Sequence, residues 1–255
     1  MIISVANNKG GSGKSTTCAN LGAALAQAGR RVLLIDGDMQ MNLSLSFFEE
    51  EEVLAFSEGS ANLLGFLQGE AKAEEVIRPT RLEGLSVIPS TAKMSGLEGW
   101  MAGRRGSAQV LTKKLAAIAG EYEVILIDAP PTLGQWTAAI LAASDRVIIP
   151  VEAAPWGLFG LANLFDFLKN VQKKSAVSVM GVLVTKVDER KNYYRQTMET
   201  LADLPDIPVF DTVIHVDSAV EWAQDVSRTV VEYKKNSRSA KEYAALAKEV
   251  EALCR

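Results

Sequence analysis

Residues 1–16 read Met-Ile-Ile-Ser-Val-Ala-Asn-Asn-Lys-Gly-Gly-Ser-Gly-Lys-Ser-Thr, and this stretch decides the fold. The apolar run at residues 2–6 predicts a buried strand. A glycine-rich turn at residues 9–13 follows, and residues 14–16 open a segment with helical periodicity. A strand, a glycine-rich turn and a helix N-terminus in this order form a cradle for phosphate, because backbone N–H groups and the helix dipole both favour an anion there.

The residues of this loop have separate expected roles. Its three glycines, Gly10, Gly11 and Gly13, let the backbone approach phosphate groups without an obstructing Cβ. Lys14 is expected to reach the β- and γ-phosphates, and the Ser15 hydroxyl is expected to hold Mg²⁺. The loop therefore predicts a site for a nucleoside triphosphate with magnesium.

Two further apolar runs end in carboxylates. Residues 32–35 lead into Asp36-Gly37-Asp38, and residues 124–127 lead into Asp128, which is followed by Ala-Pro-Pro. Ligands of an α/β sheet bind at the carboxyl ends of its strands, so these acids should lie near the phosphates. Carboxylate oxygens suit Mg²⁺, and we expect Asp128 to bind this ion directly or through water.

The rest of the chain alternates apolar runs with helical periodicity. Strands are expected at 85–88, 146–151 and 177–184, and helices at 107–119, 157–171, 190–203 and 239–253. Such alternation predicts an α/β fold of the P-loop NTPase type, with a mostly parallel twisted sheet and helices on both faces. No linker interrupts the pattern, so residues 1–255 are expected to form a single domain.

Composition excludes several classes of site. The net charge of −4 gives no overall basic field, so any contact with DNA must come from a local patch. The single histidine rules out a histidine-rich metal site, and the cysteines, Cys18 and Cys254, lack metal-ligand spacing. No apolar stretch is long enough to span a membrane. We therefore expect a cytoplasmic protein that does not bind membranes.

The loop departs from a strict P-loop, which has glycine six residues before Lys14 where this chain has Asn8. It begins instead with a second lysine, Lys9, and Lys-Gly-Gly-Ser-Gly-Lys-Ser-Thr resembles the deviant Walker A motif of the ParA/MinD family of ATPases. Residues 36–44, 128–131 and 243–249 are similar to later segments of that family. The resemblance covers nearly the whole chain and is strongest to short ParA/Soj-type partition ATPases without an N-terminal DNA-binding module.

This resemblance implies an ATP-dependent switch with slow intrinsic hydrolysis. ATP and Mg²⁺ would bind each subunit, and two subunits would close into a homodimer with the nucleotides sandwiched between them. The implied roles are catalytic for Lys9, which reaches the partner's phosphates, for Lys14, and for Asp38, which orients the attacking water. The residues implied to bind nucleotide are Gly10, Gly11, Ser12, Gly13, Lys14, Ser15 and Thr16, and those implied to surround the metal are Ser15, Asp36 and Asp128.

The resemblance also implies a cargo. Partition members bind non-specific DNA as ATP dimers, associate with the nucleoid, and are released when a ParB-like or cargo-adaptor protein stimulates hydrolysis. Two basic clusters are candidates for this contact: Arg190, Lys191 and Arg195, interleaved with Tyr193 and Tyr194, and Lys234, Lys235, Arg238 and Lys241. Many relatives carry Pro-Arg where this chain has His215-Val216, so an arginine contact at that point is not expected, and we expect His215 to line a pocket or to pack.

Two other functions remain open. Thr185-Lys186-Val187-Asp188 follows an expected strand and matches the pattern by which GTPases of the signal-recognition type read guanine. A non-catalytic scaffold that uses nucleotide only for assembly is the other alternative. Lys9 and the Asp36-Gly37-Asp38 segment favour the partition ATPase.

Overall fold

Seven strands form one sheet in the computed structural model, which describes residues 1–204 and 207–254. The strand order is β3-β4-β2-β5-β1-β6-β7, and every neighbouring pair is parallel except β3 with β4. The strands are β1 (Ile2–Val5), β2 (Val32–Asp36), β3 (Arg78–Pro79), β4 (Leu85–Ile88), β5 (Val124–Asp128), β6 (Arg146–Glu152) and β7 (Ser178–Thr185). The predicted α/β fold with a mostly parallel sheet is confirmed.

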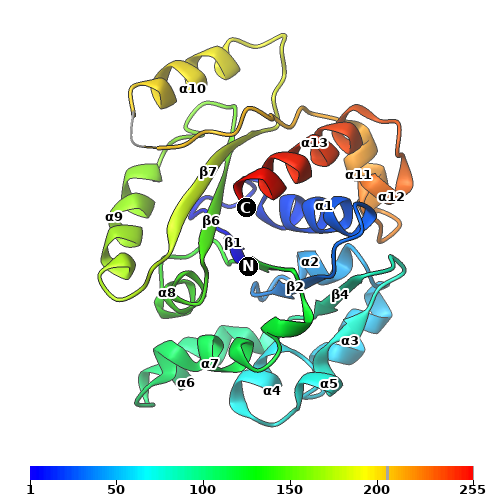
Figure 1. Ribbon diagram of the computed structural model, residues 1–255, viewed down its shortest axis with the longest axis vertical. Coiled ribbons are helices and arrows are strands. Elements are labelled where there is room, and N and C mark those ends of the chain that lie inside the picture. Colours follow the sequence, from blue (N-terminus) through cyan, green and yellow to red (C-terminus); the bar gives the residue numbers. More distant parts are fainter. Residues whose placement is uncertain (205–206, 255) are drawn as a thin grey trace.

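Helices cover both faces of this sheet, as Figure 1 shows. One face packs against α4 (Leu63–Gln68), α5 (Ala73–Val76), α6 (Leu97–Ala102), α7 (Val110–Ala116), α8 (Gln135–Ala142), α9 (Leu161–Gln172) and α10 (Tyr193–Ala202). The other packs against α1 (Lys14–Gln27), α2 (Asn42–Leu45), α3 (Glu50–Glu58), α11 (Ser218–Gln224), α12 (Val230–Tyr233) and α13 (Arg238–Leu253). Burial on both faces explains why β2 and β5 are continuous apolar runs with every residue buried.

The register of the strands brings the expected site residues to one edge. Asp36 at the end of β2 is directly opposite Asp128 at the end of β5, and Asp128 is also opposite Val5 at the end of β1. Glu152 and Thr185 end β6 and β7 side by side. The glycine-rich loop leaves β1 at this same edge, so the acids and the loop lie together, as the sequence predicts.

Two expected helices differ in detail from those of the structure. The helix expected at 157–171 begins only at Leu161, because Trp156 and Gly160 have positive φ values of 63° and 85° and hold residues 153–160 in turns. The helix expected at 107–119 is divided into a short 3₁₀ segment and α7. Helices α8, α11 and α12 have no counterpart among the expected elements.

Among the described residues, none of the helices has the length and apolar character needed to cross a membrane.

Candidate functional site

The glycine-rich loop joins β1 to α1 with two residues in left-handed conformations. Gly13 is the N-cap of α1 with φ 90°, and Gly11 has φ 74°, so a side chain at either position would be strained. No side chain of the described residues caps α1. The N–H groups of its first turn therefore remain available for an anion, which is the arrangement that phosphate groups favour.

Two side chains, Asn7 and Thr185, hold this loop in place. The Asn7 amide donates to the Pro150 carbonyl (2.7 Å) and accepts from the Lys9 backbone N–H (2.9 Å). The Thr185 hydroxyl donates to the Ser12 carbonyl at 3.0 Å. Sequence reasoning placed Thr185 only in the guanine-reading alternative, whereas the structure gives it a role in fixing the loop.

Lys14 is buried beneath the loop, with 6% of its surface exposed. Its Nζ donates to the Lys9 carbonyl at 3.3 Å. Burial lowers the pKa of the Lys14 ammonium, while the nearby carboxylates of Asp128 and Asp38 act in the opposite direction. The ammonium group is therefore held among acids at the base of the loop, where a phosphate group would add a further negative charge.

The three carboxylates at the edge of the sheet are in different situations. Asp36 is fully buried, and both of its oxygens accept hydrogen bonds, from the Ser44 hydroxyl (2.6 Å), the Ser44 N–H (2.8 Å) and the Asp38 N–H (3.2 Å). Burial raises the pKa of Asp36 to about 6. Asp38 accepts from the Gln40 N–H at 3.1 Å and lines the cleft described below. With both oxygens engaged, Asp36 is placed to organise the segment around it, and its expected place around the metal stays a prediction.

Asp128 is the acid that lacks partners. It is fully buried, and neither carboxylate oxygen has a hydrogen-bonding partner among the described residues. Burial raises the pKa of this group well above its ordinary value, and the nearby Asp36 raises it further. Two orphaned carboxylate oxygens beside the Ser15 hydroxyl are oxygen ligands of the kind that Mg²⁺ takes, so the residues present fit a magnesium ion held by Ser15 and Asp128.

Replacing Asp128 with asparagine should therefore have opposite effects on stability and binding. Removing a buried carboxylate that is desolvated, lies beside Asp36 and accepts no hydrogen bond from the described residues should raise the melting temperature of the nucleotide-free protein by roughly 2–4 °C, if about 1 kcal/mol is recovered. The extra stabilisation that Mg²⁺ adds to ADP should be lost. Thermal unfolding with ADP, with and without MgCl₂, measures both effects. A lower melting temperature with the magnesium effect intact would contradict this assignment.

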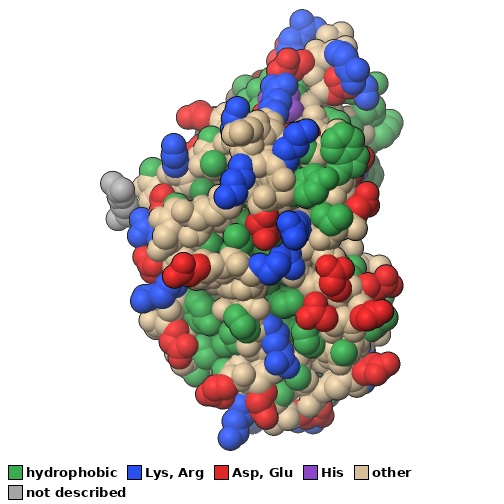
Figure 2. All heavy atoms as spheres, turned by 90° about the vertical axis from the view of Figure 1, so that its right-hand side faces the viewer, with side chains coloured by type: hydrophobic (Ala, Val, Ile, Leu, Met, Phe, Trp, Pro, Cys, Tyr) green, Lys and Arg blue, Asp and Glu red, His purple; other side chains and the backbone are tan. Residues whose placement is uncertain are grey.

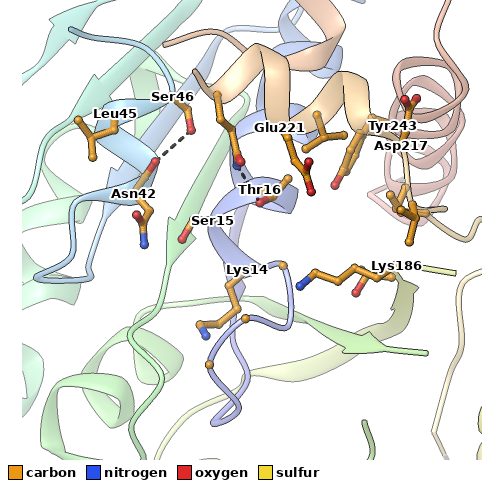
Figure 3. A pocket seen from close by; sticks show the side chains of 18 of the residues that line it. Lys14, Ser15, Thr16, Asn42, Leu45, Ser46, Lys186, Asp217, Glu221 and Tyr243 are labelled. Atoms are coloured by element: carbon orange, nitrogen blue, oxygen red, sulfur yellow. Dashed lines mark hydrogen bonds between the residues drawn. The ribbon is translucent and has the colours of Figure 1, made fainter. Parts of the chain in front are cut away.

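The loop forms one wall of a cleft of about 840 Å³. The opposite wall comes from the ends of β7, α11 and α13, and Figure 3 shows Lys186, Asp217, Glu221 and Tyr243 on that side, facing the loop residues. Of this second wall, sequence reasoning anticipated only His215, because residues 217–224 carry no recognised motif. The volume is large enough for a nucleotide, whose phosphates would lie on the loop and whose base would lie toward the second wall.

Polar contacts join the second wall to the rest of the site. The Gln224 amide donates to the Thr16 hydroxyl at 3.4 Å, which links α11 to the start of α1. His215 lines the cleft, in agreement with the expectation for it. Its Nδ1 lies 2.6 Å from Glu242, its Nε2 lies 3.1 Å from Glu189, and its backbone N–H donates to Glu242.

Lys9 behaves differently from Lys14. Its Nζ pairs with Glu152 at 3.2 Å, and the other carboxylate oxygen of Glu152 lies 4.0 Å from Lys186. Lys14 lines the cleft, whereas Lys9 is absent from the described residues that do so. Within one chain the two lysines of the loop therefore point to different partners.

The guanine-reading alternative finds no support in this geometry. The Asp188 carboxylate accepts hydrogen bonds from the Nε (2.8 Å) and from a terminal nitrogen (2.9 Å) of Arg190. It also lies 3.7 Å from the Lys191 ammonium. The hydrogen bond from Arg190 lowers the pKa of Asp188 to about 2. Its carboxylate is occupied on the surface and lies outside the set of described residues that line the cleft.

The two basic clusters meet on one surface. Arg238, at the start of α13, pairs with Glu189 (2.7 Å), the residue that precedes Arg190, and also with Glu242 (2.9 Å). In the first cluster every cation forms an ion pair within the chain. Arg190 and Lys191 pair with Asp188, and Arg195 lies 3.7 Å from Glu199.

In the second cluster, Lys234 lies over the Trp222 ring at 5.5 Å. Lys235 and Lys241 are exposed and form no ion pair with any residue that the structure describes. Figure 2 shows the face that carries α11 and α12, with Lys and Arg side chains spread among acidic ones. The surface is therefore mixed in charge, and of the two clusters only the second has cations, Lys235 and Lys241, that form no ion pair with a described residue.

Known proteins resemble this chain over its whole length. The family model described as AAA domain (AAA_31) matches residues 1–181. The sporulation initiation inhibitor protein Soj of Bacillus subtilis (strain 168) is 36% identical over 253 residues, which cover 98% of each chain. The chromosome partitioning protein ParA of Caulobacter vibrioides (strain NA1000 / CB15N) is 33% identical over 253 residues, which cover 98% of this chain and 93% of that protein.

Solved structures agree with these relatives. The cell division ATPase MinD of Pyrococcus furiosus superposes with a TM-score of 0.77 at 28% identity, covering 99% of this chain and 98% of that one. A cobyrinic acid a,c-diamide synthase from Mycobacterium smegmatis, with bound ADP and magnesium, superposes with a TM-score of 0.82 at 28% identity, covering 97% and 92%. The chain belongs to the ParA/Soj/MinD family of ATPases.

Proposed function

We propose that this protein is an ATP-dependent dimerising ATPase that partitions or positions DNA or another large cargo. The observation that carries the proposal is the separation of the two loop lysines. Lys14 lies in the cleft of its own chain, whereas Lys9 lies outside that cleft and is held by Glu152. A lysine at the edge of its own phosphate site can instead reach the phosphate site of a second subunit. In a two-fold dimer, each subunit would supply its Lys9 to the other.

The residues of the cleft have the following roles in this proposal. The N–H groups of residues 10–16 and the Lys14 ammonium bind the phosphates, and Thr16 contacts the α-phosphate. Ser15 and Asp128 would hold Mg²⁺, which would supply positive charge beside the phosphate oxygens. Asp38 orients the attacking water, and Asp36 holds the segment that carries Asp38. Lys9 of the neighbouring subunit stabilises the charge of the transition state.

The cargo is proposed to be DNA in the first instance. Two relatives, from Caulobacter vibrioides and Myxococcus xanthus, are named as chromosome partitioning proteins. On this chain the free cations Lys235 and Lys241, with Lys234 beside them, offer contacts to phosphate groups. An activator of the ParB or cargo-adaptor type would then stimulate a slow intrinsic hydrolysis and release the protein.

The proposal is tested by a gel shift on a DNA fragment of arbitrary sequence with ATP, with ADP and without nucleotide. Binding should require ATP, because only the closed dimer brings two basic surfaces to one DNA molecule. The ATP arm should use the Asp38→Ala variant as well as the wild type, so that hydrolysis does not deplete the dimer. Equal binding in all three arms, or none in any, would refute DNA as the cargo of an ATP switch.

Binding to DNA should weaken steeply as salt rises, since each neutralised phosphate releases counterions. The Lys235→Ala/Lys241→Ala variant should flatten the slope of log K against log salt by about 2 for each subunit in contact, at about 0.9 per phosphate. The Arg190→Ala/Arg195→Ala variant is the matched control. It should change the slope less, because those cations already face acids of their own chain. The reverse order would assign the contact to the first cluster.

A further inference from the structure

Trp136 connects the core of the protein to the segment between two acids of the site. It lies in the first turn of α8 and is buried, with 4% of its surface exposed. Its indole Nε1 donates to the carbonyl of Gly37 at 2.9 Å, in a contact that is itself buried. Gly37 stands between Asp36 and Asp38, so this hydrogen bond acts on the backbone that sets the direction of both carboxylates.

The Gly37 peptide is held from its other side as well. Its N–H donates to the Asp128 carbonyl at 2.9 Å. A Cβ added at Gly37 would lie 2.5 Å from that oxygen and 3.4 Å from the Trp136 Nε1. The Asp128 carbonyl therefore leaves no room for a side chain at this position, whereas the indole would be in ordinary van der Waals contact. Both polar groups of Gly37 are therefore engaged, one by Asp128 and one by Trp136.

These two hydrogen bonds tie both ends of the loop that follows β5 to Gly37. The loop runs from Asp128, whose carbonyl accepts from the Gly37 N–H, to Trp136, whose indole N–H donates to the Gly37 carbonyl. The Thr137 hydroxyl donates to the Thr132 carbonyl at 2.6 Å, and Glu98 accepts from the Trp136 N–H at 3.3 Å, which fixes the far end of the loop. Pro131, near the middle of the loop, lines the cleft. A shift of this loop at the cleft would thus be carried to Gly37.

We propose that Trp136 is a positioning residue for ATP hydrolysis. Its indole N–H holds the Gly37 carbonyl so that the Asp38 carboxylate faces the phosphate end of the cleft, and it makes that direction depend on the loop at residues 129–134. Trp136 touches neither nucleotide nor water in this role. The inference rests on the proposed ATPase function and on Asp38 as the residue that orients water.

The kinetic test compares Trp136→Phe with Trp100→Phe. Trp100 is the matched control, because it is a half-buried tryptophan on α6 that packs on the same core and stacks with Arg104, outside the cleft. Trp136→Phe should lower kcat by about 10- to 100-fold, since small displacements of catalytic groups have effects of that order. Its Kd for ATP and for ADP should stay within about threefold of the wild type. Trp100→Phe should change neither quantity.

A merely structural role for Trp136 predicts another pattern. It would lower the melting temperature of Trp136→Phe and leave kcat unchanged below that temperature, and this result would overturn the proposal. A wild-type protein without any ATP hydrolysis would instead refute the proposed function. The two failures are therefore distinguishable in the same set of assays.

A second measurement does not need the Trp136 variant to fold. The four tryptophan indole N–H signals can be assigned in ¹⁵N spectra from Trp100→Phe, Trp156→Phe and Trp222→Phe, which leave Trp136 by elimination. The Trp136 signal should exchange slowly with solvent and should shift when a non-hydrolysable ATP analogue with Mg²⁺ replaces ADP. Rapid exchange, or a signal that is identical with both nucleotides, would overturn the proposal.

Discussion

Replacing Lys9 with alanine should abolish the ATP-dependent dimer and leave nucleotide binding nearly intact. In the single chain the Lys9 Nζ contacts Glu152 and does not line the cleft, so its loss should change the Kd for ATP by no more than about threefold. In the proposed dimer each subunit contributes one Lys9 to its neighbour. The dimer should therefore weaken at least 100-fold, or about 2.7 kcal/mol.

Sedimentation velocity with ATP and Mg²⁺ measures this effect best in an Asp38→Ala background, where the nucleotide persists. Glu152→Gln is the informative control. It keeps the shape of the side chain and removes the charge that holds Lys9 and Lys186. Because the pair is only partly buried, its loss should strengthen the ATP dimer modestly, by about 0.5–1 kcal/mol for each subunit. If the Lys9→Ala/Asp38→Ala protein formed the dimer as readily as Asp38→Ala alone, Lys9 would have no role across the interface.

The sequence is most informative where local chemistry specifies structure. The apolar runs of β2 and β5 predict buried strands because covered strands have no polar face. The glycines at 11 and 13 predict the loop because they let the backbone approach phosphate groups without a Cβ, and their positive φ values in the structure agree with this. The carboxyl edge follows from these strands. The proximity of Asp36, Asp128 and Lys14 is therefore predictable from the amino-acid sequence.

The remaining parts of the site depend on contacts between distant residues. The hydrogen bond from Trp136 to Gly37 joins residues 99 positions apart, and no spacing in the sequence signals it. The second wall of the cleft comes from α11, whose seven residues are too few for a clear periodic pattern. The pairing of Arg190 with Asp188 is not signalled either. This ion pair reduces the free positive charge of the first basic cluster, which the sequence alone presents as basic.

Asp38→Ala should retain the ATP dimer and lose hydrolysis by at least 100-fold. A carboxylate that orients water or accepts its proton contributes about 10²–10⁴ in rate. Asp38 is buried to 6% exposure at the cleft, and its hydrogen bond to the Gln40 N–H is the contact that the change removes. It also removes one of three neighbouring acids, so the folded protein should not lose much stability. Phosphate release in steady state measures the rate.

The matched control for this variant is Asp188→Ala. Asp188 is also an aspartate that follows a strand of the same sheet, but it pairs with Arg190 away from the cleft, so its loss should leave ATP turnover unchanged. A loss of ATP turnover in Asp188→Ala that higher ATP concentrations did not restore would contradict the placement of Asp188 outside the site. Turnover that survived in Asp38→Ala would carry a different meaning. The attacking water would then not depend on the Asp38 carboxylate, and the role proposed for Asp38 would be refuted.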